Sequence, residues 1–302
     1  MYRTFDSEMK RLFGKKVWKL SLDGGMTCPN RDGSVGFGGC IFCAGGGRFV
    51  PETALDIDGQ IEKAKAILGR KAENTGFLAY FQSGTNTYAS ADELRKLFMP
   101  VICRDDILGM SVGTRPDCLG NDVCEVLGEL GKIKPLWVEL GLQTSNNNTA
   151  KLINRGYTCE VFDLAMEKLA KLSVQRVVHV IVGLPGESEK DVFNTVSHVS
   201  RFRPEGVKFH LLHVMKGTEL EKMWQRGEVD ELSLERYADI ISECVRLLPP
   251  ETVVHRITGD GDKRLLLAPK WSGDKKRVLN TLNRALDKVV QGEKFSEVEK
   301  SE

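Results

Sequence analysis

Several features that would place this chain outside the ordinary globular proteins are missing from its sequence. It contains no stretch of about 18 consecutive apolar residues, so we expect no membrane-spanning helix. The first residues, MYRTFDSEMKRLF, lack the apolar run that a secretory signal needs, so we expect a cytoplasmic protein. Disulfides are rare in that reducing compartment. The eight cysteines are therefore expected to be buried residues, metal ligands or nucleophiles.

An excess of charge of one sign is also missing, because the net charge is only +1. The charges are nevertheless unevenly distributed along the chain. Basic residues outnumber acidic ones at the start (Arg3, Lys10, Arg11, Lys15, Lys16, Lys19) and again later (Lys263, Arg264, Lys270, Lys275, Lys276, Arg277). Such segments can contact phosphate backbones, and a solvated charged face explains them equally well.

Short apolar runs alternate with longer amphipathic stretches, which predicts βαβ units and a parallel sheet. The strand-like runs are 17–22, 76–81, 107–112, 136–142, 177–184 and 206–214, and the helical patterns between them lie near 57–70, 91–102, 119–130, 158–172 and 188–202. Six such units are too few for a complete eight-stranded barrel. We therefore expect an α/β fold with a partial (β/α)6 TIM-like barrel of parallel strands, an open sheet being the alternative.

Further elements follow the sixth unit. Helical patterns lie near 217–226, 232–248 and 275–290, with a short strand near 252–257. The chain shows no internal repeat and no low-complexity linker. We expect one barrel domain at 1–260, which includes the basic N-terminal extension, and a basic, helical C-terminal extension at 261–302 that packs on it.

Three cysteines, Cys28, Cys40 and Cys43, follow the first predicted strand with the spacing C-x11-C-x2-C in a glycine-rich segment. A structural zinc site almost always has four protein ligands, and no further cysteine or histidine lies nearby. Three thiolates suit a four-iron cluster with one iron left open. Buried apolar cysteines fit poorly with the polar neighbours of this loop, and the loop lacks the GxGxxG spacing of a dinucleotide-binding loop.

Polar or glycine-containing segments follow the other predicted strands, at the ends where barrel enzymes place their chemistry. These segments are FQSGTNTYAS, GTRPDC, WVELGLQTSNN with INRGY, and HVIVGLPGES. Glycine lets a ligand approach the backbone closely. Arg155 offers a forked donor to a carboxylate, although a surface ion pair explains it equally well, and Gln143 offers an amide.

Taken together, these motifs resemble those of the radical S-adenosylmethionine (SAM) enzymes. More closely, the chain resembles the YhcC/YtqA family, which is related to the radical domain of the elongator catalytic subunit. The resemblance implies a [4Fe–4S] cluster on Cys28, Cys40 and Cys43 and a bound SAM that is cleaved to a 5′-deoxyadenosyl radical. The first cysteine gap is wider than in the usual C-x3-C-x2-C motif, and the acidic residue typical of the glycine-rich motif is absent. SAM contacts are implied for Ser83, Gly84, Thr85, Gln143, Arg155, Ile181 and Gly183.

The same resemblance favours tRNA as the partner, with a wobble uridine whose 5-position side chain changes from carboxymethylaminomethyl toward aminomethyl. It also implies an electron donor of the flavodoxin or ferredoxin type. Two alternatives stay open: a radical enzyme for a small molecule such as a porphyrin precursor, and a non-catalytic, zinc-bound RNA-binding module. Glu139, Lys208, His210 and His213 are candidates for substrate contact, and the sequence does not choose among them.

Overall fold

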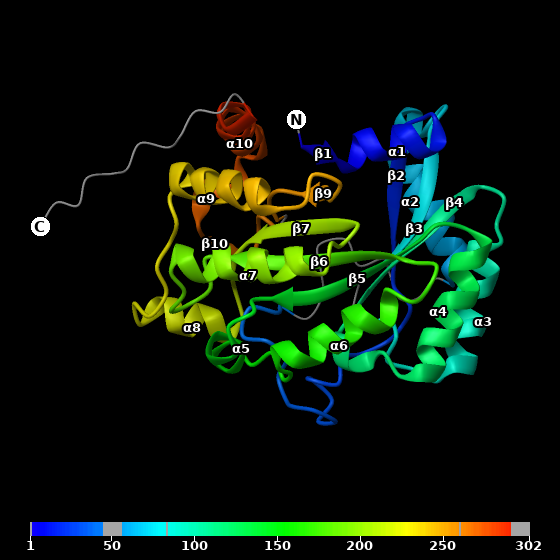
Figure 1. The fold of residues 1–302 in the computed structure, drawn as a ribbon, viewed down its shortest axis with the longest axis horizontal. Coiled ribbons are helices and arrows are strands. Elements are labelled where there is room, and N and C mark those ends of the chain that lie inside the picture. Colours follow the sequence, from blue (N-terminus) through cyan, green and yellow to red (C-terminus); the bar gives the residue numbers. More distant parts are fainter. Residues whose placement is uncertain (1, 45–55, 83, 260, 291–302) are drawn as a thin grey trace, which may run out of the picture.

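The core of the protein is one curved sheet of parallel strands. The structure is a computed structural model that describes residues 2–44, 56–82, 84–259 and 261–290. Eight strands are hydrogen-bonded in the order β1-β9-β7-β6-β5-β4-β3-β2, and every neighbouring pair is parallel (Figure 1). The strands are β1 (Arg3–Thr4), β2 (Val17–Leu22), β3 (Gly76–Phe81), β4 (Ile107–Thr114), β5 (Leu136–Gln143), β6 (Gln175–Val182), β7 (Gly206–Leu211) and β9 (Val253–Arg256).

The helices are joined to these strands by short connections, and several begin at side-chain caps. Ser90 and Ser188, for example, form capping boxes at the starts of α3 and α7. The helices are α1 (Phe5–Phe13), α2 (Ile57–Leu68), α3 (Ala91–Ile102), α4 (Asn121–Ile133), α5 (Asn147–Leu152), α6 (Cys159–Leu169), α7 (Glu189–Arg201), α8 (Glu219–Gln225), α9 (Leu234–Leu247) and α10 (Lys275–Val290). Strands β8 (Val214–Met215) and β10 (Leu266–Ala268) form a separate antiparallel ribbon.

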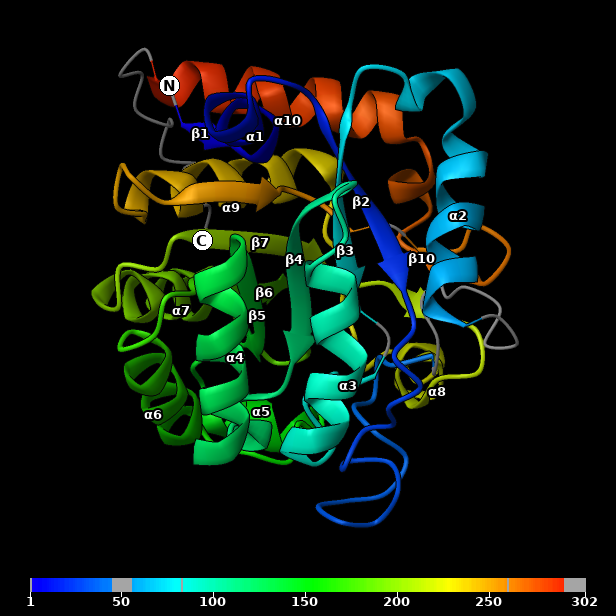
Figure 2. The same cartoon turned by 90° about the vertical axis from the view of Figure 1, so that its right-hand side faces the viewer.

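The predicted α/β partial barrel is confirmed, and β2 to β7 are the six strands expected from the sequence. The sheet continues past β7 through β9 and β1, so that the start of the chain lies beside its C-terminal part (Figure 2). The sequence predicts β9 as a strand but not its parallel pairing with β7. Among the described residues, no helix combines the length and apolar character that crossing a membrane requires.

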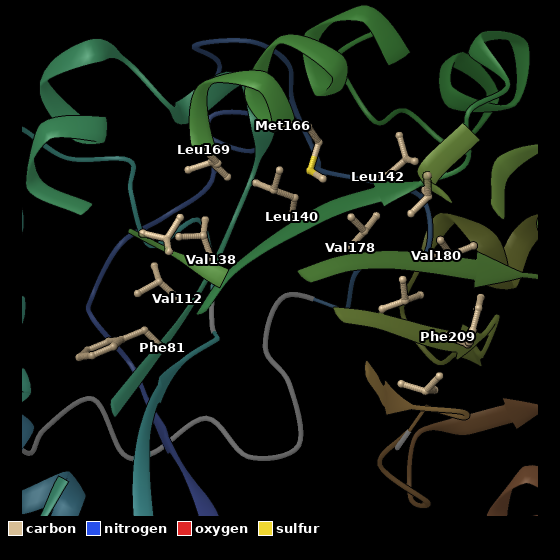
Figure 3. Packing of buried hydrophobic residues seen from close by; sticks show 14 of the residues in the cluster. Phe81, Val112, Val138, Leu140, Leu142, Met166, Leu169, Val178, Val180 and Phe209 are labelled. Carbon is tan, nitrogen blue, oxygen red and sulfur yellow. The ribbon is translucent and has the colours of Figure 1, made fainter. Parts of the chain in front are cut away.

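The two faces of the sheet differ in chemistry because side chains alternate along each strand. The outward positions are apolar and pack beneath the helices. Phe81, Val112, Val138, Val178 and Phe209, on five successive strands, are all fully buried there, and the helix α6 packs over part of this layer (Figure 3). Toward the carboxyl ends of the strands the inward positions are polar, whereas toward the amino ends Val17, Leu78, Trp137 and Val177 form a smaller apolar cluster with Met9. The main hydrophobic core therefore lies between the sheet and its helices, and the carboxyl-end part of the barrel interior is left for other groups.

Candidate active site

The three loop cysteines face a shared cavity at the carboxyl ends of the strands. This cavity has a volume of about 590 Å³, and Cys28, Cys40 and Cys43 all line it. All three are free thiols. The same cavity is lined by residues of four strand ends, among them Gly84, Thr85, Gln143 and Arg155, and reaches down to Tyr80, Glu139 and His179. The sequence-predicted cysteines and most of the predicted SAM contacts thus meet at one site.

The wide gap between Cys28 and Cys40 is occupied by a small hairpin-like finger. A bridge between Asp32 and Phe37 and a hydrogen bond from Gly33 N to Gly36 O (3.1 Å) close its tip. At its base Gly39 has a φ of +79°, and a Cβ there would lie 2.9 Å from Arg31 Nε. The backbone conformation and the close approach both favour glycine, so the turn brings the chain back to Cys40.

Asparagine side chains fasten this finger to the loop after α5. Asn30 Nδ2 donates to Asn154 O (2.6 Å), and Asn154 Nδ2 donates to Gly39 O (2.8 Å). Next to Cys40, Ile41 N donates to Ile153 O (3.1 Å). Arg31 Nη2 also donates to Cys43 O (2.6 Å). These contacts fix two of the three thiols relative to the residues predicted to hold SAM.

The thiol arrangement fits a cluster better than a single metal ion. In a tetrahedral zinc site, zinc–sulfur bonds of about 2.3 Å separate the sulfurs by roughly 3.8 Å. The Sγ atoms of Cys28, Cys40 and Cys43 do not all lie within 4.8 Å of one another. Burial raises the pKa of Cys40 to about 11, and Cys43 and Cys28 add to this shift while Arg115 opposes it. Metal binding offsets the free energy of ionising such a thiol, because the ligand is the thiolate. Three thiols around an open cavity therefore suit a [4Fe–4S] cluster.

A second group of potential ligands lies on the outside of the barrel. Cys159 and Asp163 of α6 meet His198 of α7, with Cys159 Sγ 3.3 Å and Asp163 Oδ1 2.6 Å from His198 Nε2. Arg201 Nη2 donates to His198 Nδ1 (2.5 Å), which places the imidazole proton on Nε2, where it points to Asp163. Burial raises the pKa of Cys159 to about 11. This group is a hydrogen-bonded link between two helices and is separate from the cysteine loop.

Of the three residues of the predicted glycine-rich SAM turn, Gly84 and Thr85 lie at the cavity wall, and Ser83 lies outside the described residues. The φ of Gly84 is +67°, and a Cβ at this position would overlap the carbonyl oxygen of Met26. Thr85 N donates to Thr27 O (3.0 Å), beside Cys28. The turn after β3 and the start of the cysteine loop therefore pack backbone to backbone, and only glycine fits between them.

Gln143 ends β5 at an irregular point of the sheet. Its φ of +68° is unusual for a residue with a side chain, and the β5–β6 register shifts between Gly141 and Gln143. Its side chain lines the cysteine cavity and also a second cavity of about 310 Å³. Backbone strain of this kind is concentrated at functional sites. The geometry is consistent with the predicted contact between the Gln143 amide and a ligand.

Arg155 is buried at the same wall, but most of its hydrogen-bonding capacity is already used. Its Nη1 donates to Leu142 O (2.5 Å) and Thr144 O (2.6 Å), and Nε and Nη2 both donate to Tyr157 O. Four of its five N–H groups are therefore occupied by backbone carbonyls, and one on Nη2 remains. Arg155 holds the loop after β5 in place. Only the remaining N–H group on Nη2 is available for its predicted contact with SAM.

The last two predicted SAM residues lie apart from the cysteines. Ile181 is buried and lines the 310 Å³ cavity, which shares Phe42, Gln143 and His179 with the cysteine cavity. Gly183 instead lines a much smaller cavity beside Leu212 and Val229. The structure thus brings Ile181 next to the cysteine cavity, whereas it places Gly183 at a different cavity.

Charged and polar side chains from six strands meet at the bottom of the cysteine cavity. The Glu139 carboxylate, 1% exposed, is their common acceptor. Lys19 Nζ lies 2.8 Å from Oε1, while Tyr80 Oη (3.0 Å) and His179 Nε2 (2.8 Å) contact Oε2. Ser111 Oγ and Lys208 Nζ also hydrogen-bond to this carboxylate. We refer to Lys19, Tyr80, Ser111, Glu139, His179 and Lys208 as the Glu139 cluster.

The protonation states in this cluster follow from burial and charge. Burial opposes ionisation of Glu139, but Lys19, Lys208 and His179 outweigh it and hold the pKa well below its usual range. Burial lowers the pKa of His179 to about 4 in spite of Glu139. The pKa of Tyr80 is raised by burial and by Glu139. At neutral pH the cluster therefore contains an ionised carboxylate with a neutral imidazole and a neutral phenol.

Sequence reasoning names Glu139 and Lys208 singly as candidates for substrate contact and assigns no site role to Lys19, Tyr80, Ser111 or His179. Lys19 was counted among the basic residues at the start of the chain, and the structure corrects this placement by pairing it with Glu139 inside the barrel. A usable signal was present, since each of these six residues is a polar or hydrogen-bonding position flanked by apolar residues or glycine in a predicted strand. Tyr80 follows Ala79, and Ser111 follows Met110.

Two family models match the chain over nearly all of the described barrel. The Radical SAM superfamily model matches residues 28–199, and the Radical_SAM C-terminal domain matches residues 204–288. The chain is 40% identical to the uncharacterized protein YtqA of Bacillus subtilis over 302 residues, which is 99% of this chain and 94% of YtqA. It is 35% identical to the protein YhcC of Escherichia coli over 292 residues, or 95% of this chain and 93% of YhcC.

More distant similarity extends to longer proteins, of which the match covers only part. The chain is 31% identical to the tRNA uridine(34) acetyltransferase of Methanocaldococcus jannaschii over 156 residues, 51% of this chain and 28% of that protein. Among solved structures, the archaeal Elp3 of Methanocaldococcus infernus superposes with a TM-score of 0.66 at 19% identity, covering 89% of this chain and 63% of that one. That structural likeness supports the partial-barrel fold.

Proposed function

The chain belongs to the radical SAM superfamily, in a family with YtqA and YhcC that is related to the elongator proteins, and from this membership we propose that it modifies the wobble uridine of tRNA. It is an enzyme that uses a [4Fe–4S] cluster and SAM. The proposed reaction converts a 5-carboxymethylaminomethyl side chain toward 5-aminomethyl. The carbon between the amine and the carboxylate would lose one hydrogen atom and one further electron, with the oxidised cluster as the electron acceptor. Water would then cleave the resulting imine, so that the two carbons leave as glyoxylate and the amine stays on the uridine. When bound, the two cofactors supply a 5′-deoxyadenosyl radical that removes a hydrogen atom from the substrate.

The residues of the chain have distinct parts in this proposal. Cys28, Cys40 and Cys43 hold the cluster. The Gly84–Thr85 turn and Gln143 position SAM, and Arg155 keeps the loop after β5 in place. The finger at 29–39 and the barrel wall keep water and other hydrogen donors away from the reacting atoms. The 310 Å³ cavity adjoins the cysteine cavity, and we propose that it holds the substrate base after the base has flipped out of its stack.

The observation that carries the tRNA proposal is the similarity to proteins named for acting on tRNA uridine 34. The location of basic residues gives it partial support. Lys263 and Arg264 are exposed and follow Gly261 and Asp262, which line the 310 Å³ cavity. The early basic residues give less support, because α1 and the residues before β2 lie at the amino ends of the strands, opposite the cysteine loop. We propose that RNA phosphates approach from the 261–264 side.

Two further parts of the proposal concern the setting of the reaction. We propose a cytoplasmic location, where tRNA is available, and an electron donor of the flavodoxin or ferredoxin type. The described residues include no second three-cysteine motif that would hold another cluster, which supports an electron donor outside this part of the chain.

The test is mass spectrometry of tRNA nucleosides from cells with and without the gene. Cells lacking it are expected to accumulate 5-carboxymethylaminomethyluridine and to lose the aminomethyl derivatives. Complementation with the wild-type gene should restore the pattern, whereas a Cys40→Ala gene should not. Identical nucleoside profiles in all strains would reject the tRNA proposal and would favour a small-molecule substrate.

A further inference from the structure

The barrel interior contains more positive than negative charge around the Glu139 cluster. Lys19 and Lys208 share the Glu139 carboxylate. Arg256 of β9 pairs in register with Lys208 of the neighbouring strand, which directs both side chains to the same side of the sheet. Arg256 has no hydrogen bond or ion pair with any described residue. A guanidinium stays protonated in proteins, so at least this positive charge lacks an anionic partner.

The surroundings of Arg256 show that its charge is directed to the interior. It acts electrostatically on Tyr80, His179, Lys208 and His210, all of which face inward. His210 and His179 stack at 5.0 Å between ring centroids and line the 310 Å³ cavity. The Nε2 atom of His210 is buried and has no hydrogen-bond partner within the described part of the chain. A buried ring nitrogen without a partner is a polar group left for a ligand.

Negative groups near this region are already engaged. Glu139 is surrounded by its five hydrogen-bond donors, and Asp262 at the rim of the cavity pairs with the exposed Arg264. The cationic residues near the cysteine loop are likewise engaged, since Arg115 forms a two-point ion pair with Asp117 and Arg155 binds carbonyls. Arg256 is therefore distinct from the arginines at the predicted SAM site.

We propose that Arg256, with His210, binds a carboxylate of the substrate inside the barrel, and that Glu139 positions Lys208 beside it. This inference rests on the proposed function, because the carboxymethylaminomethyl side chain supplies such a carboxylate. The planar fork of arginine matches a carboxylate in two-point geometry. An aminomethyl product lacks the carboxylate, so the same contact distinguishes substrate from product.

The experiment compares two matched tRNAs on the holoenzyme with its cluster reconstituted and SAM bound. One tRNA carries carboxymethylaminomethyl at the wobble uridine, and the other carries aminomethyl. The wild type is expected to bind the first about 10-fold to 100-fold more tightly, the range that hydrogen bonds to charged groups contribute. Arg256→Gln should abolish this preference, and Arg256→Lys, which keeps the charge, should retain most of it. Arg226→Gln, which removes an exposed ion pair with Glu228 just after α8, is the matched control.

Two readouts separate carboxylate binding from other roles of Arg256. The Kd for SAM and the iron content should be unchanged in Arg256→Gln. If Arg256→Gln binds both tRNAs more weakly by the same factor, the residue contacts backbone phosphate and the proposal is overturned. Weaker binding of SAM by the same variant would also overturn it. A methyl ester of the side chain tests the same contact without altering the protein. Wild type that binds the ester as tightly as the free carboxylate would also overturn it.

The carboxylate site is testable even when tRNA proves to be the wrong substrate. N-methylglycine carries the same amine and carboxylate, and methylamine lacks the carboxylate. Saturation-transfer NMR on the holoenzyme is expected to show binding of N-methylglycine but not of methylamine, and Arg256→Gln should abolish the signal. Binding of N-methylglycine without turnover of any tRNA would reject the wobble function and keep the carboxylate site. Equal signals for both compounds, or for both proteins, would reject the site.

Discussion

Replacing Glu139 by glutamine tests whether the interior of the barrel is an ion network that depends on one carboxylate. Glutamine keeps the shape of the side chain and removes its charge. Lys19 and Lys208 would then lie inside the barrel without a counter-charge, while Tyr80 and His179 would lose an ionised acceptor. Removing one partner of a buried ion pair usually lowers the free energy of unfolding by about 3–5 kcal/mol.

The corresponding thermal shift follows from the length of the chain. Unfolding entropies of about 2.1 cal/mol/K per residue give roughly 0.6 kcal/mol/K for 302 residues, so the loss corresponds to a fall of about 5–8 °C in Tm. Urea unfolding followed by circular dichroism measures the same loss as a lower midpoint at unchanged slope. Glu129→Gln is the matched control, because Glu129 pairs with Arg95 at the surface and should leave the midpoint where it is.

Two further measurements show whether the charge itself is responsible. Lys208→Met in the Glu139→Gln background should recover part of the lost stability, since it removes one of the two lysines that are left without a counter-charge. The pKa of Glu139 is lowered in the folded state, so its contribution is complete above the pKa of the unfolded carboxyl and is lost as the pH falls toward the folded value. The variants should therefore converge in acid. A Glu139→Gln protein as stable as wild type at pH 7 would refute the reasoning.

Three other predictions concern the loop, a glycine turn and a histidine. Cys40→Ala should lose bound iron, acid-labile sulfide and 5′-deoxyadenosine formation, whereas Cys159→Ser, on the outer helices, should retain all three. Gly84→Ala and Gly14→Ala share a φ near +68°, but only at Gly84 would the added Cβ collide with backbone. In urea, the positive φ should cost each variant about 1 kcal/mol of unfolding free energy, and the collision should cost Gly84→Ala clearly more and weaken its SAM binding. Equal losses in the two variants would argue against the collision. The pKa of His179 is lowered to about 4 by burial, so its stability contribution falls as the pH drops below about 6.5. His179→Gln should reduce the slope of unfolding free energy against pH by up to about 1.4 kcal/mol per pH unit. Urea midpoints measured at pH 7 and pH 5 report this slope, and a slope equal to that of the wild type would contradict the burial argument.

The cysteine loop was predictable because its function is encoded locally. The spacing of Cys28, Cys40 and Cys43, the glycines between them and the preceding strand all lie within about 30 residues. The alternation of apolar runs and helical patterns likewise predicted β2 to β7 and most helices to within a few residues. What the spacing did not reveal is the finger inside the wide gap, because its bridge from Asp32 to Phe37 and its anchor at Asn154 join residues that carry no distinctive pattern.

The Glu139 cluster was not predictable in the same way, because its members lie on six strands and meet only through the register of the sheet. Lys19 and Lys208 are separated by most of the barrel in sequence, yet both reach one carboxylate. A single polar residue in a strand has many explanations. Only the pairing of neighbouring strands brings these six residues together into one site. The same reason explains Lys19, which looks like a surface charge beside its basic neighbours.

The position of a residue within a sequence motif did not predict which cavity the residue faces. Ile181 and Gly183 belong to one segment, HVIVGLPGES, but they face different cavities because the chain turns at the end of β6. Arg155 lies at the cavity wall, but the carbonyls of Leu142, Thr144 and Tyr157 already occupy four of its donors. Whether a side chain is available to a ligand depends on which local hydrogen bonds it has already made, and sequence spacing contains no record of these.

The contrast between the two faces of the sheet argues that the interior was selected for chemistry. A buried carboxylate with two lysines is usually no more stabilising than apolar residues of similar size, and the outer face shows that this chain can supply such residues on the same strands. In β3 to β6, a shift of one position along the strand moves from Phe81, Val112, Val138 or Val178 to Tyr80, Ser111, Glu139 or His179. Substitutions at the first set should change stability alone, because those side chains belong to the hydrophobic core between the sheet and the helices. Substitutions at the second set should change ligand affinity and pH dependence as well, because those side chains line or support the cavity that the cysteines face.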